Sequence, residues 1–154
     1  KFQHEYDIGD GALIQGFNVY DGKGLDVERF EYQANHFVGY LDLVECVGTV
    51  AIEGYAYGAR GKVFNIGENT GILKLKIIES DYQLEVLQPG EIKKFATGKG
   101  NANKQAMYDA WLVETGIDLE EIMDCKGDSG PINDVVDSYY ICKLAWENEY
   151  GNKS

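Results

Sequence analysis

Cysteine and long apolar runs are scarce in this chain of 154 residues. Its three cysteines, Cys46, Cys125 and Cys142, are an odd number without a CxxC spacing or a histidine-containing zinc pattern around them. We interpret them as reduced, packed thiols rather than as disulfides or metal ligands. No run approaches the roughly 18 apolar residues of a membrane span, and no charged and apolar leader opens the chain. These absences favour a cytoplasmic protein without a membrane partner.

Basic residues are also few, with 14 Lys and Arg against 26 Asp and Glu and a net charge of −12. Such a balance argues against nucleic-acid binding unless the cations gather locally. Residues 60–104 do hold 8 basic and only 5 acidic side chains. Six of these cations fall in two glycine-rich stretches that we expect to be loops: Arg60, Lys62, Lys93, Lys94, Lys99 and Lys104. The alternative is that they are ordinary solvated side chains.

The hydrophobic pattern predicts a single mixed α/β domain over residues 1–154. Strands are expected over residues 2–8, 12–20, 47–55 and 83–87, and helices over 26–45, 63–78, 104–115 and about 129–147. A loop is expected to begin at Pro89-Gly90 and to lead into the helix that starts at Lys104. The alternation of strands and helices favours parallel pairing in a sheet covered by helices.

Two helices are expected to bury particular apolar stripes. For the helix over 63–78 the inner residues are Val63, Ile66, Thr70, Leu73 and Ile77. For the last helix they are Ile132, Val135, Val136, Tyr139, Cys142 and Trp146.

Three acidic residues carry most of the functional information. Glu53 lies at the end of the apolar run over residues 50–55, and Asp134 and Asp137 share one face of the last helix because they are three residues apart. Glu53 could be only a solvated strand end, and Asp134 could be a favourable charge in the first turn of a helix. Asp137 lies among apolar residues, where two carboxylates repel unless a cation or proton intervenes. A strand-end carboxylate with a helical pair suits hard divalent ions that assist phosphodiester cleavage.

Three segments together resemble the RuvC family of Holliday-junction resolvases. They are Ala51-Ile52-Glu53-Gly54-Tyr55, the basic glycine loop of residues 93–105, and Asn133-Asp134-Val135-Val136-Asp137 with its continuation to Tyr140. They occur in the family's order and at comparable separations, over about residues 47–146. The resemblance is greatest to phage or prophage members. It implies an RNase H-like fold, in which a mixed sheet is flanked by helices, and the activity of a crossover junction endodeoxyribonuclease.

The resemblance also implies roles for individual residues. Glu53, Asp134 and Asp137 match the family's metal-binding catalytic carboxylates, with two Mg²⁺ or Mn²⁺ ions as cofactors. Lys93 and Lys104 match the basic positions near the scissile phosphate. Tyr55 or Tyr57 matches an aromatic residue that stacks near the junction centre, an interaction worth ~1–3 kcal/mol per base.

The glycine loop between these two lysines lacks the spacing of a P-loop and its Lys-Ser/Thr end. One interpretation of this loop is a surface turn before a helix. Its functional interpretation is that backbone amides face a phosphate and that Lys99 and Lys104 supply the charge.

The chain departs from the family at its start. Members begin with an apolar strand that carries a first catalytic aspartate, and this chain opens at Lys1 without it. We expect that N-terminal strand to be missing from the chain as given. Asp7 is a weaker substitute, because residues 2–6 are too polar for a buried central strand.

Paired nicks across a four-way junction require a two-fold assembly, so we expect a homodimer acting on branched DNA in a bacterial or phage-infected cell. One alternative is a less selective nuclease of the same fold. Another is a module that binds junctions or other nucleic acids without cutting them. The sequence leaves open the cleavage preference, the physiological metal and the dimer surface.

Overall fold

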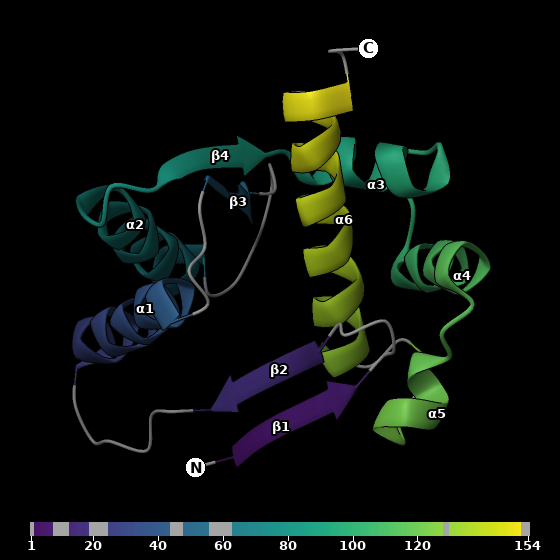
Figure 1. Cartoon of the computed structure of the whole chain (residues 1–154), viewed down its shortest axis with the longest axis horizontal. Coiled ribbons are helices and arrows are strands. Elements are labelled where there is room, and N and C mark those ends of the chain that lie inside the picture. Colours follow the sequence, from purple (N-terminus) through teal and green to yellow (C-terminus); the bar gives the residue numbers. More distant parts are fainter. Residues whose placement is uncertain are drawn as a thin grey trace. The chain divides into compact units, whose positions relative to one another are not determined.

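The computed structural model describes residues 2–7, 13–18, 25–43, 48–55, 63–127 and 130–151. Strands β1 (Phe2–Asp7) and β2 (Leu13–Asn18) form a hydrogen-bonded pair (Figure 1). Both strands were predicted from sequence, and Asp7 is the last residue of β1. The contact pattern divides the chain into two compact units, residues 1–2 with 17–86 and residues 3–16 with 87–154.

The first unit contains a strand–helix–strand arrangement. Helix α1 (Asp26–Leu43) is followed by β3 (Thr49–Glu53), α2 (Val63–Glu79) and β4 (Gln83–Leu87). β3 and β4 are neighbours in a two-stranded parallel sheet, as the alternating pattern predicted, because α2 provides the long connection that parallel strands need. α1 packs against α2.

The core of this unit joins its two helices to the sheet. Its buried residues are Val38 of α1, Val50 of β3 and Ile77 of α2, and partly buried Leu41, Ile52, Leu73, Tyr82 and Leu84 pack around them. β3, which packs in this core through Val50 and Ile52, ends at Glu53.

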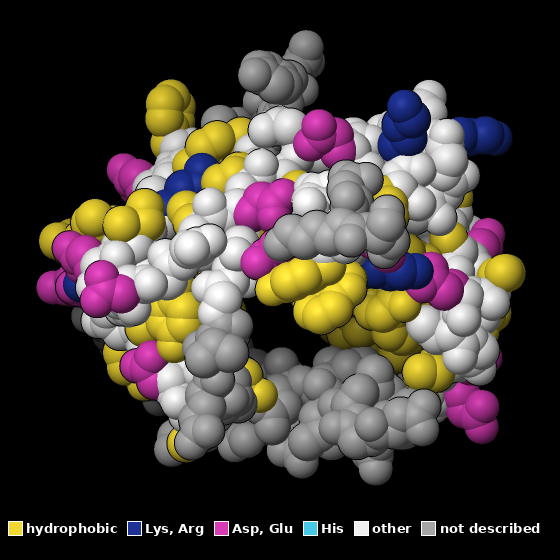
Figure 2. Space-filling view, turned by 45° about the horizontal axis from the view of Figure 1, so that its top comes forward, with side chains coloured by type: hydrophobic (Ala, Val, Ile, Leu, Met, Phe, Trp, Pro, Cys, Tyr) yellow, Lys and Arg dark blue, Asp and Glu magenta, His cyan; other side chains and the backbone are white. Residues whose placement is uncertain are grey.

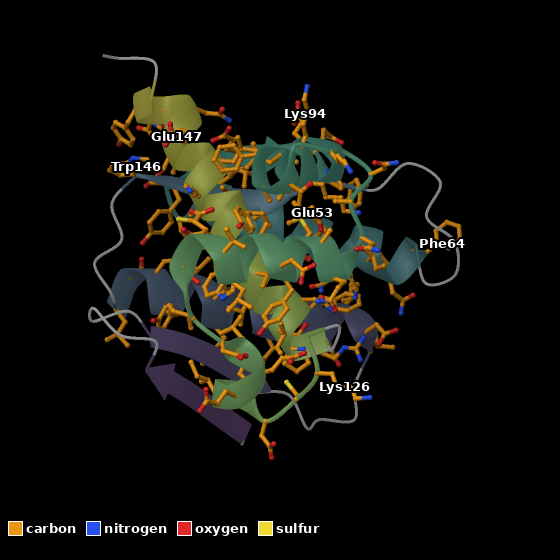
Figure 3. All side chains as sticks on the ribbon, turned by 90° about the vertical axis from the view of Figure 1, so that its right-hand side faces the viewer. Glu53, Phe64, Lys94, Lys126, Trp146 and Glu147 are labelled. Carbon is orange, nitrogen blue, oxygen red and sulfur yellow. The ribbon has the colours of Figure 1, made fainter. Side chains whose placement is uncertain are left out.

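One prediction for α2 was wrong. Ile66, expected to face inward, is 54% exposed, and Phe64 is 84% exposed and projects from the helix (Figure 3). The helix carries apolar residues on more than one face, so periodicity alone does not identify the face that is covered. Ile77, on the predicted stripe, is buried as expected.

The second unit is built on a long helix. α3 (Pro89–Thr97), α4 (Lys104–Thr115) and α5 (Leu119–Met123) each contact α6 (Gly130–Tyr150) (Figure 1). Its largest fully buried side chains are Trp111, Leu119, Ile132, Val136 and Tyr140. None of the helices in the described ranges is long and apolar enough to cross a membrane.

The start of α3 corrects the loop expected from Pro89-Gly90. Proline is tolerated at the first position of a helix, where its missing N–H has no helical partner. Gln88 and Glu91 form a capping box, in which the Gln88 backbone N–H donates to Glu91 Oε2 at 3.1 Å. The helix ends at Gly98, which has a left-handed φ of 78°. Lys93 and Lys94 therefore lie on a helix rather than in a loop.

The inner stripe of α6 was predicted in part. Ile132 and Val136 are buried and Val135 and Tyr139 are partly buried, but Cys142 is exposed and Trp146 is 62% exposed. Tyr140 and Ala145 are buried instead. The buried residues in the first half of the helix, Ile132, Val136 and Tyr140, are spaced by four residues. Cys142 and Trp146 do not continue this spacing.

Candidate active site

The acidic pair lies near the N-terminal end of α6. Asp134 is exposed and Asp137 is partly buried, one turn further along the same face. Burial raises the pKa of Asp137, and the neighbouring Asp134 carboxylate raises it further. The charged form of Asp137 is therefore disfavoured by its surroundings, which is the condition that a bound cation relieves.

Two predicted lysines lie close enough to act on this carboxylate. Lys104 is the first residue of α4, and Lys93 is on α3. The positive charges of both lysines lower the pKa of Asp137, and they oppose the rise that burial and Asp134 cause. The structure thus brings together four of the predicted site residues, from three helices of one unit. The spacing in the chain from Lys93 to Asp137 gives no direct indication of this arrangement.

The turn between α3 and α4 sets the start of α4. Asn103 caps that helix by accepting a hydrogen bond from the Ala106 backbone N–H at 2.9 Å. Thr97 closes the end of α3, because its hydroxyl donates to the Lys93 carbonyl at 2.8 Å and accepts from the Lys99 N–H at 3.2 Å. Sequence reasoning missed both residues, although Asn before a helix is a known capping signal.

A close backbone approach ties this turn to the start of α3. A Cβ atom at Gly100 would lie 3.1 Å from the carbonyl oxygen of Gly90. Only glycine allows this approach without displacing backbone. Gly100 is therefore explained by close backbone packing, independently of any phosphate binding by the loop.

Lys99 lies on the same turn, exposed to solvent. It lines an open groove of about 640 Å³ together with Thr97, Asn101 and Asn103. Lys94, by contrast, points outward from α3 (Figure 3). The turn therefore presents one lysine beside polar side chains next to the start of α4.

The remaining predicted residues lie in the first unit. Glu53 is exposed at the end of β3. Tyr55 follows it and is 47% exposed; its hydroxyl donates to the Gly67 carbonyl at 3.2 Å, and Lys74 Nζ lies 4.8 Å from its ring centroid. These contacts orient the tyrosine ring against α2, and its stacking on a base stays a prediction.

Other predicted residues cannot be placed. Tyr57, Arg60 and Lys62 lie outside the described residues, and so does the side chain of Asp7.

A metal site is supported by the chemistry of the acidic pair rather than by a complete ligand set. Among the described residues, no three His, Cys, Asp or Glu side chains are grouped so that they could hold a metal ion. The oxygen donors of Asp134 and Asp137 are nevertheless of the type that Mg²⁺ and Mn²⁺ prefer. The addition of Glu53 to this pair stays a prediction.

The excess of acidic over basic residues in the chain bears on how a polyanion could be held. On the face shown in Figure 2, acidic side chains are spread widely and Lys and Arg occur in a few separate places. This face therefore presents no broad basic surface to a polyanion among the residues that the structure describes. Local attraction by Lys93, Lys99 and Lys104 is the alternative.

Comparison with known proteins gives a likeness of fold. The structure of RuvC from Thermus thermophilus matches with a TM-score of 0.61 and 15% identity, covering 97% of this chain and 88% of that protein. A second structure, T. thermophilus RuvC in complex with a Holliday junction substrate, matches with a TM-score of 0.57 and 12% identity, covering 96% and 87%. No protein-family model and no curated protein sequence matches the chain. The structural likeness supports an RNase H-like fold for this protein.

Proposed function

We propose that the protein is a metal-dependent endonuclease that cuts four-way or other branched DNA. One observation carries the proposal: on α6, the partly buried Asp137 carboxylate lies beside Asp134 and is attracted by Lys93 and Lys104. Carboxylates that can hold metal ions, next to cations that can hold a phosphate, suit metal-dependent phosphodiester hydrolysis. The likeness to RuvC, one structure of which holds a Holliday junction substrate, supports branched DNA as the substrate class.

The proposed roles follow from the chemistry of the side chains and from their match to the motifs of the RuvC family. Asp134, Asp137 and Glu53 would hold Mg²⁺ or Mn²⁺, two ions in all. When bound, such ions lower the pKa of a water molecule and neutralise charge on the phosphate.

The cationic residues would orient the DNA. Lys104 would contact a phosphate oxygen near the acidic pair, and Lys93 would support it from α3. Lys99 would hold the backbone further along the strand. Tyr55 would stack on an unpaired base near the junction centre.

The proposal extends to assembly and origin. Two nicks of opposite strands require two active sites related by a two-fold axis, so a homodimer is the expected form. We expect the protein to be encoded by a phage or prophage and to act in the cytoplasm of a bacterial cell. Sedimentation of the purified protein, with and without a junction, tests the dimer.

The decisive experiment measures nicking of a synthetic four-way junction by the full-length protein in the presence of Mg²⁺. Asp134→Asn should reduce the rate at least about 100-fold, because it removes a metal-binding charge. Asp124→Asn is the matched control: Asp124 is exposed, and its left-handed φ of 47° suits Asn. Calorimetric titration with Mn²⁺ gives a readout without cleavage, and Asp134→Asn should weaken binding there too.

Other outcomes identify the alternatives. Tight junction binding without any cleavage would favour the binding module. Equal rates on linear duplex and on junctions would favour a less selective nuclease. Full activity of Asp134→Asn would overturn the proposed site.

A further inference from the structure

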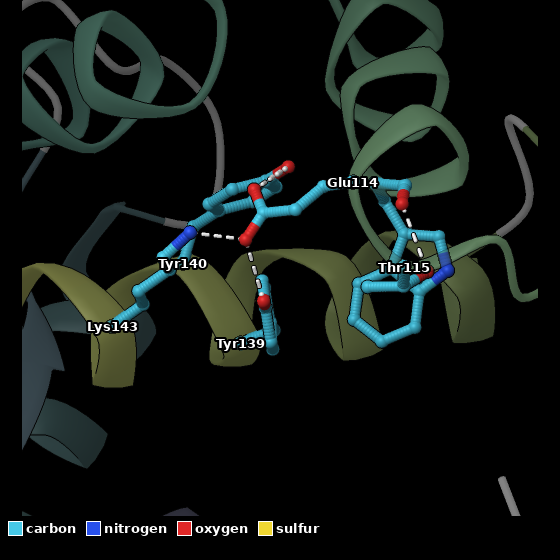
Figure 4. Close-up of polar contacts among 6 residues, drawn as sticks. Glu114, Thr115, Tyr139, Tyr140 and Lys143 are labelled. Carbon is cyan, nitrogen blue, oxygen red and sulfur yellow. Dashed lines mark hydrogen bonds and ion pairs between the residues drawn. The ribbon is translucent and has the colours of Figure 1, made fainter. Parts of the chain in front are cut away.

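A second charged cluster joins α4 to α6, and its residues on α6 follow the acidic pair along that helix. Glu114, in the last turn of α4, accepts hydrogen bonds from three donors on α6 (Figure 4). The Tyr139 hydroxyl donates to Oε1 at 2.7 Å and the Tyr140 hydroxyl to Oε2 at 3.3 Å. The Lys143 ammonium group also donates to Oε1 and forms an ion pair with it. One carboxylate thus receives three donors from a single neighbouring helix.

The cluster also reaches α3. Lys143 Nζ lies 5.8 Å from the ring centroid of Phe95 on α3 and 5.9 Å from that of Tyr139. The buried ring of Trp111 meets Tyr139 edge-on, with centroids 4.8 Å apart. The helices joined here, α3, α4 and α6, are the same three that carry Lys93, Lys104 and the acidic pair.

The interactions are of a kind that resists rearrangement. Burial alone would raise the pKa of Glu114, but hydrogen bonds from Lys143 and Tyr139 outweigh it and the pKa is lowered. Glu114 is therefore a carboxylate at neutral pH and a charged acceptor for its donors on α6. Hydrogen bonds to charged groups are roughly twice as strong as neutral ones.

We propose that Glu114 is a positioning residue that fixes the register of α4 on α6, and with it the placement of Lys104 beside Asp137. The inference rests on the proposed function. Glu114 is ten residues from Lys104, a distance on the order of 15 Å along the helix. A small rotation of α4 at Glu114 therefore moves its other end. Displacement by about 1 Å is enough to slow a reaction about 100-fold where geometry controls the rate.

The test separates positioning from general stability. Glu114→Gln keeps the size of the side chain and removes its charge. We expect kcat for junction cleavage to fall about 5- to 20-fold with KM changed less than about twofold, at a temperature where circular dichroism shows the variant to be folded. Glu147→Gln is the matched control, because Glu147 is an exposed carboxylate on α6 one turn beyond Lys143.

A double variant tests whether the cluster acts as a unit. Glu114→Gln with Lys143→Met should be about as slow as the slower single variant, because both changes break the same contact. Fully additive losses would overturn a shared positioning role. An unchanged kcat with a lower melting temperature would reduce the cluster to structural support and would also overturn it.

A spectroscopic arm keeps the inference testable if the wild-type protein does not cleave DNA. Nitroxide labels on Lys104→Cys and Asp134→Cys, in a chain that also carries Cys46→Ser, Cys125→Ser and Cys142→Ser, report the separation of α4 from α6 by dipolar broadening. Glu114→Gln should change the broadening and Glu147→Gln should not. Identical spectra would overturn the inference, whereas absent cleavage with a changed spectrum would count against the proposed function alone.

Discussion

The pKa of Asp137 is set by effects of opposite sign. Burial and Asp134 disfavour its charge, and Lys104 and Lys93 favour it, with a net rise in its pKa. A carboxylate that served only to stabilise the fold would be expected to show the opposite shift. A charge that its surroundings disfavour lowers the free energy of unfolding, and such costs are typical of functional sites.

Replacement of Asp137 should therefore stabilise the metal-free protein at neutral pH. The folded-state pKa is raised above the unfolded value of about 3.9, so the fold carries the cost of the charge in full above the raised pKa. As pH falls through the raised pKa towards about 3.9, the folded state takes up the proton first and the cost disappears. Asp137→Asn avoids the cost, so its gain in the free energy of unfolding should be present at pH 7 and should shrink over that window.

Thermal unfolding of both proteins from about pH 7.5 to about pH 4 measures this difference. Mg²⁺ should raise the melting temperature of the wild type more than that of the variant, because it binds the folded carboxylates. A variant less stable than the wild type at neutral pH would show that the carboxylate is satisfied by its neighbours.

At the scale of elements, the turn between α3 and α4 is held by backbone conformations that only particular residues adopt. Gly98 ends α3 with φ 78°, and its N–H donates to the Lys94 carbonyl at 2.8 Å. Asn103 then starts α4. Lys93 and Lys104 are separated by this turn, so its geometry sets how the two cations face Asp137.

Two glycine substitutions should have opposite effects on the free energy of unfolding. Gly98→Ala should lower it by about 1–2 kcal/mol, because an L side chain is strained at this left-handed φ. Gly71→Ala, within α2, should raise it by about 0.5–1 kcal/mol, because no atom lies within 4 Å of the added Cβ and alanine favours the helix.

Urea unfolding of the two variants beside the wild type gives both values. Equal stability of Gly98→Ala and wild type would mean that the turn accepts another conformation. A destabilised Gly71→Ala would indicate a contact of this face of α2 that its open space does not reveal.

At the scale of the whole molecule, the strongly negative charge limits how DNA can be held. Long-range repulsion by a chain with a net charge of −12 opposes association, most strongly at low ionic strength. Close contacts between a few lysines and phosphates must compensate for it. The salt dependence of binding counts these contacts.

Lys99→Met should lower the slope of log affinity against log salt concentration by about one for each copy of the chain that contacts DNA. Filter binding or fluorescence anisotropy with a four-way junction, in EDTA to prevent cleavage, measures the slope. Lys126→Met is the control, since Lys126 is exposed and does not belong to the proposed site. The same loss of slope in both variants would mean that the charge of Lys99 acts only as part of the net charge.

The sequence predicted much of this molecule, and its failures have identifiable causes. The sequence predicts β3, α2 and β4 as elements, although not the covered face of α2, and α4 begins at Lys104 as predicted. The Pro89-Gly90 pair predicts a break, whereas the structure has a helix there, whose capped start is signalled by Gln88 and Glu91.

The sequence predicts only those parts of the candidate site whose residues are close together in the chain. Asp134 and Asp137 share a face by their spacing, but their approach to Lys93 and Lys104 depends on how three helices pack. The same holds for Glu114, which is 25 residues from Tyr139 in the chain, and nothing in the local pattern joins them. The addition of Glu53 to these residues remains a prediction.

The two tryptophans of the chain differ sharply in environment, and this gives the second unit a native optical reporter. Trp111 is buried against Tyr139, beside the Glu114 cluster, whereas Trp146 is exposed on α6. Iodide should quench the emission of Trp146 and leave that of Trp111. The residual fluorescence of the unlabelled protein would then follow the packing between α4 and α6 in real time, during metal addition, junction binding or unfolding.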